Sequence, residues 1–458
     1  MTVDQTKHLQ LESTYLDDYR SAIRSKTIPW DGFARSELLT SQQAKQLSEL
    51  EGATVRKRVE KVLSEEHAEA YASTLFDLLS KKMPQERSDI KKYILVLISD
   101  LLDHGEFAQR VLAKDPHTTL NALVEYVDSS DEIVKLLSLY NAVYLLIQPG
   151  IQSNVEPSVV IRVFEELNAL VDATSFNLKF FALELISDLL AVKPYRPIYW
   201  QSHSKFIPNL FQNLNGHIAH NSTESIQFQY KILLSLWLLT FNHKVLVDFS
   251  KYYLSETLSL LSLAKSSIKE KIVRLVVSIF INLTSIPANE AINLHNLKYL
   301  ILMGDILPTL SNLKERKWSD EELIEDLDVL YNSVQDVYSQ LTSFDEYLQE
   351  LDSKQFKNSP VHSNDEFFMD NLEKFQDNNY KVFKQLLKLL DVPHMEPKSL
   401  VLVLGDIGRI LKLDPKSIEI LSKVDKKHTI MDLLNHKNSE VRYQALKATQ
   451  FIVSQTFK

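Results

Sequence analysis

One pattern of apolar residues returns along this chain at a spacing of 44 residues, with copies that start at Ile90, Val134 and Leu178. Each start is followed by a lysine. Positions four, five, eight, eleven and twelve residues later are apolar in nearly every copy, as Ile94 and Leu183 illustrate. These offsets place the side chains on one stripe of an α-helix. Each copy therefore predicts a helix that buries one face.

Looser copies of the pattern occur further along the chain. They start at Ile226 (with Tyr230, Leu234 and Trp237), at Ile268 (with Ile272, Val273, Val276, Ile279 and Phe280) and at Val441 (with Ala445, Leu446, Ile452 and Val453). A shorter apolar stretch and a polar turn precede some copies, as at Leu123–Val127 and Ile430–Leu434. Helix pairs with a period in the mid-forties are typical of HEAT and armadillo repeats, in which stacking of neighbouring units supplies the core. The predicted fold class is all-α, a HEAT/armadillo-like helical-repeat solenoid.

The first part of the chain is predicted to be mostly helical. Residues 9–50 predict two helices interrupted by a turn at Pro29–Gly32, because Pro and Gly favour turns. Repeats then run from about 70 to 310. Ser319–Glu322 has the spacing of a capping box and starts a long amphipathic helix that continues to Leu341.

Beyond that helix the pattern changes. No helical stripe continues through residues 353–371, which predicts a connection, and prolines at both ends of the loop 391–398 stop its neighbouring helices. We therefore predict two modules, an N-terminal helical-repeat domain at 1–340 and a C-terminal helical-repeat domain at 341–458, with the connection around 341–371.

Composition narrows the class of protein. The chain has 8 Gly, 14 Pro and 45% hydrophobic residues, which suits a mostly helical protein. It has no cysteine, which excludes disulfides, thiolate zinc sites and thiol nucleophiles and fits an intracellular protein. A net charge of −9 gives no general reason to bind nucleic acid. The longest apolar stretch, Ile232–Phe241, is half of what a membrane span needs, so membrane location is expected to come through a partner.

No catalytic, cofactor-binding or metal site is predicted. The chain lacks a phosphate-binding loop, an H-E-x-x-H pair and a G-x-S-x-G elbow. Gly405 and Gly408 lie in a helical pattern, where close helix packing explains them best. His67 stands among glutamates and is interpreted as part of a solvated helix face. The pattern argues for a protein that is not an enzyme.

A solenoid presents a concave surface suited to protein ligands. Aromatic residues near the module edges are candidates for such contacts, although local packing explains each of them equally well. The complete set of predicted partner-contact residues is Trp30, Trp318, Asp320, Phe344, Asp345, Tyr347, Pro360, His362, Pro393 and His394.

Three stretches go beyond a generic repeat protein: Trp30–Ser36, Glu315–Leu323 with its continuation to Leu341–Tyr347, and Ile430–His436 with Ala445–Gln450. In order and spacing they resemble the H subunit of the eukaryotic vacuolar-type proton-pumping ATPase, and the fungal members most closely. The chain departs from the family pattern at Asn358 and Phe368, where tryptophans are usual, and its loop 391–398 is shorter.

The resemblance implies a non-catalytic regulatory subunit that supports ATP hydrolysis coupled to proton transport in the assembled pump and silences hydrolysis in the detached soluble sector. The larger domain would bind the peripheral stalk, which the E and G subunits form. The smaller domain would bind the cytosolic part of the membrane-anchored a subunit, and the rotor or catalytic subunits after detachment. The chain would lie peripherally on the cytoplasmic face of the vacuolar membrane, and in the cytosol when detached.

Two other classes compete with this interpretation. A scaffold or transport-receptor solenoid that binds peptides in its groove would carry a ladder of Trp and Asn at one repeat position, whereas this chain has only 4 Trp, which do not recur in repeat register. An enzyme without a recognised motif is the third class.

Overall fold

The computed structural model of this protein describes residues 14–51, 53–63, 68–81, 88–102, 105–114, 116–218, 222–341, 344–354, 356 and 359–456. His67 and Asn358 lie outside this set. Helices and short turns make up the described residues, and no β-strand occurs among them. This confirms the predicted all-α fold class.

The chain divides into two compact units, residues 1–249 and 250–458. This division does not test the predicted domain boundary at 340. The helices of the first unit are α1 (Thr14–Arg24), α2 (Trp30–Arg35), α3 (Ser41–Glu51), α4 (Val55–Leu63), α5 (Ala68–Ser80), α6 (Ser88–Leu102), α7 (Gly105–Lys114), α8 (Pro116–Val124), α9 (Glu132–Leu146), α10 (Pro157–Val171), α11 (Phe176–Ala191), α12 (Tyr195–Trp200), α13 (His203–His217) and α14 (Thr223–Leu239), with the short turn η2 (Gln152–Asn154).

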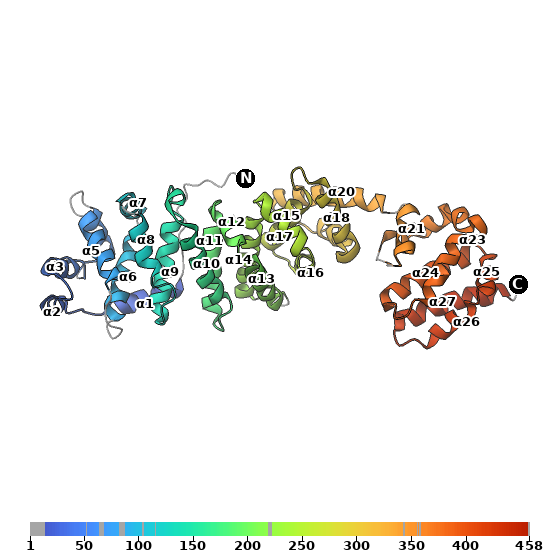
Figure 1. Cartoon of the computed structure of the whole chain (residues 1–458), viewed down its shortest axis with the longest axis horizontal. Helices are drawn as coiled ribbons and strands as arrows, with labels where there is room; N and C mark the ends of the chain where they lie inside the picture. Colours follow the sequence, from blue (N-terminus) through green and yellow to red (C-terminus); the bar gives the residue numbers. More distant parts are fainter. Residues whose placement is uncertain are drawn as a thin grey trace. The chain divides into compact units, whose positions relative to one another are not determined.

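Repeat packing organises the first unit. α6, α9 and α11 begin at residues 88, 132 and 176, which is the predicted spacing of 44 residues. Figure 1 shows α6, α9, α11 and α14 following one another, and each packs against the next. The predicted stripes of the first three copies are buried, from Ile90 to Leu190. These three copies of the pattern are confirmed as helices that bury the predicted face.

Buried polar side chains join neighbouring repeats. The Asn141 amide on α9 donates to the Leu95 carbonyl of α6 at 3.0 Å, and Ser99 donates to the Asn141 Oδ1 at 2.7 Å. The Tyr195 hydroxyl donates to the Leu146 carbonyl at 2.9 Å. Because a buried polar group without a partner is costly, these bonds define one register for each helix against the next.

The start of the chain corrects one prediction. Pro29 does not open a loop, because α2 begins at Trp30 directly after it. Its φ of −78° suits the residue before a helix. The Trp30 side chain is buried against Tyr93, and its indole N–H donates to Glu51 at 2.7 Å. The sequence around Pro29–Gly32 therefore forms a short packed helix rather than a turn.

The second unit contains the remaining elements, and α15 (His243–Tyr252) crosses the division. They are α16 (Leu258–Ser266), α17 (Glu270–Thr284), α18 (Glu290–Gly304), α19 (Ile306–Lys314), α20 (Glu321–Gln340), α21 (Phe344–Ser353), η3 (Pro360–Ser363), α22 (Asp365–Asp370), α23 (Leu372–Lys388, with non-helical residues 377–380 inside), η4 (Leu389–Asp391), α24 (Pro397–Leu413), α25 (Ser417–Lys423), α26 (Lys427–Asp432), η5 (Leu433–Asn435) and α27 (Ser439–Thr456).

The long helix predicted after Ser319 is confirmed as α20, but its cap differs from the prediction. Asp320, and not Ser319, caps the helix by accepting a hydrogen bond from the Leu323 backbone N–H at 3.2 Å. The Ser319 hydroxyl donates instead to Glu270 at 2.7 Å. α20 packs on α17, α18 and α19, so it continues the helical repeats.

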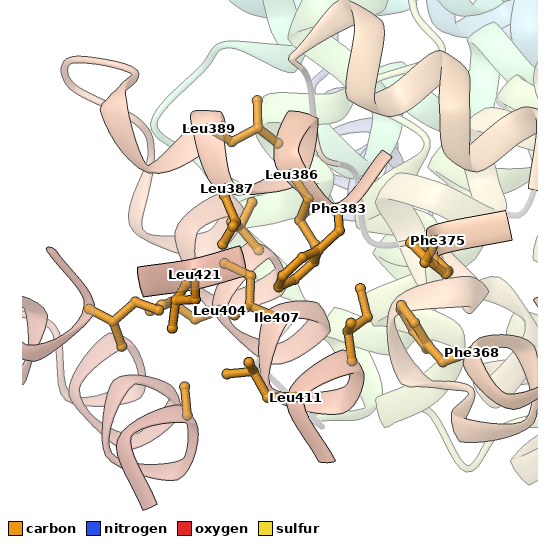
Figure 2. Packing of buried hydrophobic residues seen from close by; sticks show 14 of the residues in the cluster. Phe368, Phe375, Phe383, Leu386, Leu387, Leu389, Leu404, Ile407, Leu411 and Leu421 are labelled. Carbon is orange, nitrogen blue, oxygen red and sulfur yellow. The ribbon is translucent and has the colours of Figure 1, made fainter. Parts of the chain in front are cut away.

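Residues from Tyr347 to Ile452 share one apolar core. Figure 2 shows Phe383, Leu386 and Leu387 of α23 gathered over Leu404 and Ile407 of α24. Phe356, Val361, Phe367 and Phe368 also belong to this core. The part of the chain predicted to be a connection at 353–371 is therefore, where described, a packed part of the C-terminal core.

The three looser repeat copies agree with the predicted register only in part. In α14 the buried stripe runs one residue earlier, and Ile226 is only half-buried. Ile268 precedes α17 and is 80% exposed, but the rest of its copy is buried as predicted, namely Ile272, Val273, Val276, Ile279 and Phe280. On α27, Leu446 is 48% and Val453 is 41% exposed, whereas Val441, Ala445 and Ile452 are buried as predicted. An apolar residue beside the buried face, or just before the helix, can fit the same sequence spacing as a residue on the buried face. The pattern alone therefore did not distinguish exposed apolar residues from buried ones.

Candidate functional site

A group of charged and polar side chains lies inside the C-terminal core. His362 of η3 is 4% exposed and lies between two carboxylates. Its Nδ1 is 2.6 Å from Oδ2 of Asp406 on α24, and its Nε2 is 2.8 Å from Oε2 of Glu350 on α21. The Tyr347 hydroxyl donates to the same Asp406 oxygen at 3.3 Å. The network thus joins η3 to both α21 and α24.

The surroundings decide the charge of His362. Burial alone would lower its pKa, but the charge and hydrogen bond of Asp406, followed by those of Glu350, outweigh burial and raise the pKa from 6.5 to about 9. The ring is therefore protonated at neutral pH, and both ring N–H groups donate to carboxylates. Arg409 adds a second cation near Asp406, with Nη1 3.6 Å from Oδ1. His362 and Arg409 thus place two cations beside the buried Asp406 carboxylate.

We expect this network to make stability depend on pH. Because the folded-state pKa of His362 lies above the unfolded value, its contribution is fully present below about pH 6.5 and is lost as pH rises through about 9. A shift of that size corresponds to roughly 3 kcal/mol. The free energy of unfolding, measured with denaturant, should fall between pH 6 and 9.5. The protection of the α24 amides against hydrogen exchange should fall over the same range.

His362→Gln should remove most of this pH dependence, since the neutral amide does not titrate. His394→Gln, at an exposed loop position, is the matched control and should retain the decline. An identical pH profile for His362→Gln and for the unchanged chain would contradict the assignment of the decline to His362.

Acidic side chains of α20 are partly matched by cations of the preceding helices. Arg274 of α17 bonds Asp320 at 2.8 Å and also contacts Glu322. Lys314 pairs with Asp328 at 2.7 Å. Exposed ion pairs of this kind stabilise a fold by at most about 1 kcal/mol. The acidic residues in the first turns of α20 therefore serve in part to attach this helix to α17 and α19.

Four of the predicted partner-contact residues are buried. Trp30, Tyr347, Pro360 and His362 are packing residues in this structure, because their side chains lie within the helical cores. Trp318 is half-buried, and its indole N–H donates to the Leu313 carbonyl at 2.8 Å. For these residues the local-packing interpretation describes the geometry.

The remaining candidates lie nearer the surface. Asp345 is exposed at the start of α21, and Phe344 beside it is half-buried against the C-terminal core. Asp320 is half-buried at the start of α20. Pro393 and His394 are exposed between η4 and α24. The structure does not gather these residues into one site, and their contact with a partner stays a prediction.

Sequence reasoning missed Asp406, Glu350 and Arg409. Asp406 follows Gly405 inside an apolar helix, which is a signal in itself, because an acidic residue on a buried stripe requires a cationic partner. The distance along the chain to His362 concealed that partner. The two ring contacts of His362 depend on the fold of residues 344–410 and not on any local motif.

The two helical glycines agree with the prediction in position, but Gly408 does not agree with the close-packing explanation. Both lie inside α24, as expected. A side chain at Gly408 would meet nothing within 4 Å, whereas one at Gly405 would approach the end of Arg409 at 3.2 Å and that of Gln444 at 3.9 Å. Close packing of another helix therefore does not explain Gly408.

Gly408→Ala is accordingly expected to raise the free energy of unfolding by about 0.5–1 kcal/mol, because Ala restricts the unfolded chain and favours helix without a clash. Chemical denaturation measures the change. Gly405→Ala is the comparison and should gain less, since Arg409 must move. A loss of stability in Gly408→Ala would restore the close-packing interpretation.

Within the described ranges, no cluster of three or more His, Asp or Glu side chains has the arrangement of a metal site. No single helix in the described part of the chain is long and apolar enough to cross a membrane; only α14 and α15 together reach that length and composition, and they are bent by 115°. The stacked helices define a helical-repeat protein.

The comparisons with known proteins specify that class. The family of the V-ATPase H subunit matches this chain with its N-terminal part over residues 14–334 and with its C-terminal part over residues 340–457. The H subunit of the V-type proton ATPase of Drosophila melanogaster is 24% identical over 451 residues, which cover 96% of this chain and 90% of that protein. The corresponding H subunit of Dictyostelium discoideum is 25% identical over 438 residues, with 93% and 92% covered.

A shorter match is closer in sequence. One of the probable V-type proton ATPase H subunits of Caenorhabditis elegans, numbered 1, is 32% identical over 256 residues, which cover 54% of this chain and 55% of that protein. Because the family matches nearly all of the chain, the chain belongs to the family of V-ATPase H subunits. The predicted family is thereby confirmed. The closer resemblance to its fungal members stays a prediction.

Proposed function

We propose that this chain is the regulatory, non-catalytic H subunit of a vacuolar-type proton-pumping ATPase. The match of the family over both parts of the chain carries the proposal. In the assembled pump the chain supports ATP hydrolysis coupled to proton transport, and in the detached soluble sector it silences hydrolysis. Its place is peripheral, on the cytoplasmic face of the vacuolar membrane, and in the cytosol after detachment. It has no nucleotide site of its own.

Different parts of the chain serve different partners in this proposal. Residues 1–340 bind the peripheral stalk formed by the E and G subunits. Residues 341–458 bind the cytosolic part of the membrane-anchored a subunit in the assembled pump and the rotor or catalytic subunits after detachment. The core shared by Tyr347 to Ile452 supports a boundary near 341, because that core takes its buried side chains from α21 onward. α20, by contrast, packs on α17 to α19.

The ATPase activity of the detached soluble sector tests this division. The full chain is expected to silence hydrolysis, residues 1–340 alone are expected to leave it active, and silencing is expected to require residues 341–458. Circular dichroism of each fragment confirms that it is folded before it is assayed. Complete silencing by residues 1–340 would overturn the division. A full chain that neither binds the sector nor changes its activity would overturn the regulatory function itself.

The contacts of the tryptophans disfavour the alternative of a peptide-carrying solenoid. Trp30 and Trp318 donate their indole N–H groups to their own chain, at 2.7 Å and 2.8 Å. The Trp200 indole donates to Asp248 at 3.1 Å and is buried. A peptide groove of that kind would require exposed indoles at one repeat position.

A further inference from the structure

A pocket opens on the C-terminal helices between α24 and α27. Gly405 and Gly408 form part of its wall, and the missing side chain at Gly408 leaves open space there. Phe451 of α27 also contributes to the lining. The pocket arises because two helical positions that face it carry no side chain.

Positive charge converges on this pocket. Arg409 and Lys412 of α24 and Lys447 of α27 line it, against one carboxylate, Asp365. The Arg409 Nε donates to Asp365 at 2.8 Å. Lys412 and Lys447 are exposed, and among the described residues neither has an ion pair. Two cations therefore remain uncompensated at the pocket of a chain whose net charge is −9.

The Asp365 carboxyl is influenced by all three cations. The hydrogen bond from Arg409 lowers the pKa of the Asp365 carboxyl, and the charges of Arg409, Lys412 and Lys447 lower it further. All three cations also line the same pocket. A second anion at the pocket would experience the same attraction.

Exposed apolar side chains lie beside the pocket on the same helix. Tyr443 is 59% and Leu446 is 48% exposed, and both lie within about one turn of Lys447. The Lys447 ammonium lies 5.8 Å from the centre of the Tyr443 ring. Aromatic and aliphatic side chains next to exposed cations are a combination that anchors protein partners.

We infer that the pocket and the adjoining face of α27 form a docking surface for an acidic helical segment of a protein partner. One carboxylate of the segment enters the pocket between Lys412 and Lys447, and an apolar residue one helical turn away contacts Tyr443 and Leu446. Charge complementarity supplies the argument for the occupant, and the apolar neighbours favour a protein segment over a free phosphate. The hollow, with Arg409 already held by Asp365, suits an inserted side chain better than a flat bilayer surface. The inference rests on the proposed function and specifies a contact surface within it.

The test uses the full chain and a purified vacuolar-type pump that lacks this subunit. Lys412→Glu with Lys447→Glu should weaken binding to the pump by roughly tenfold or more, because the cations become repulsive to carboxylates. Lys423→Glu with Lys437→Glu changes the net charge equally at exposed positions of the same unit, and should stay within about twofold. A thermal unfolding curve shows that both variants are folded, and Lys412→Gln with Lys447→Gln provides a milder second pair.

A photo-crosslinking residue at Leu446 identifies the occupant. The expected product joins α27 to a segment of a pump subunit that contains carboxylates. Crosslinks to lipid alone, or to a segment without acidic residues, would overturn the inference, as would normal binding by the Lys412/Lys447 charge-reversed chain. Failure of the unchanged chain to bind the pump would instead overturn the proposed function.

Discussion

Asp406→Ala is expected to lower the stability of the C-terminal core by about 3–5 kcal/mol, because it leaves the buried His362 cation without its nearest carboxylate. The Tyr347 hydroxyl loses its acceptor in the same change. Both groups lie in the core, where water does not replace the missing partner. Hydrogen exchange of the α24 and α27 amides should therefore accelerate by a factor on the order of 10² to 10⁴.

Asp365→Ala provides the matched control. Asp365 also bonds a cation, Arg409 at 2.8 Å, but its side chain is 64% exposed. Water screens such a pair, so its removal should change stability by no more than about 1 kcal/mol. If Asp365→Ala and Asp406→Ala destabilised the core equally, the buried network would not be the feature that holds η3 in place.

Leu183→Ala is expected to lower the free energy of unfolding by about 2–5 kcal/mol, from the lost transfer free energy and the cavity that remains. Leu183 lies in the middle of α11 and is 0% exposed. Because each repeat obtains its core by contact with its neighbours, the loss also affects α9 and α14, which pack against α11. Chemical denaturation of the full chain measures it.

Leu446→Ala tests whether the repeat register or the structure describes α27 correctly. The sequence pattern places Leu446 on the buried stripe, whereas the structure leaves it 48% exposed. Its removal should therefore cost about 0.5 kcal/mol or less, as at the exposed Glu325 of α20. A loss as large as that of Leu183→Ala would show that Leu446 is buried and that the structural register is wrong.

The repeat architecture was predictable where every copy of the pattern repeats at one spacing. Ile90, Val134 and Leu178 start stripes that are buried in the structure, because a spacing of three and four residues defines one face of a helix regardless of what packs on it. The prediction failed at Ile268 and Leu446. Apolar residues at those positions fit the spacing but lie outside the contact faces.

The candidate site was less accessible to sequence reasoning. Trp318 and Asp320 were singled out by residue type and location. In the structure the Trp318 indole donates to the Leu313 carbonyl, and Asp320 caps the start of α20. Residues near Pro360 lack a helical stripe, which is the usual pattern of a linker. Their apolar side chains nevertheless contribute to the C-terminal core, and such a contribution requires no periodicity.

By itself the sequence determined the all-α class, the repeat period and the family of V-ATPase H subunits, since helical spacing and extended motifs are local properties of the chain. Only the tertiary structure decided that His362 is held between Asp406 and Glu350, and that Lys412 and Lys447 converge on one pocket. His362 lies 44 residues from Asp406 along the chain, and Lys412 lies 35 residues from Lys447. Their proximity depends on how α21, α24 and α27 pack, which no local pattern encodes.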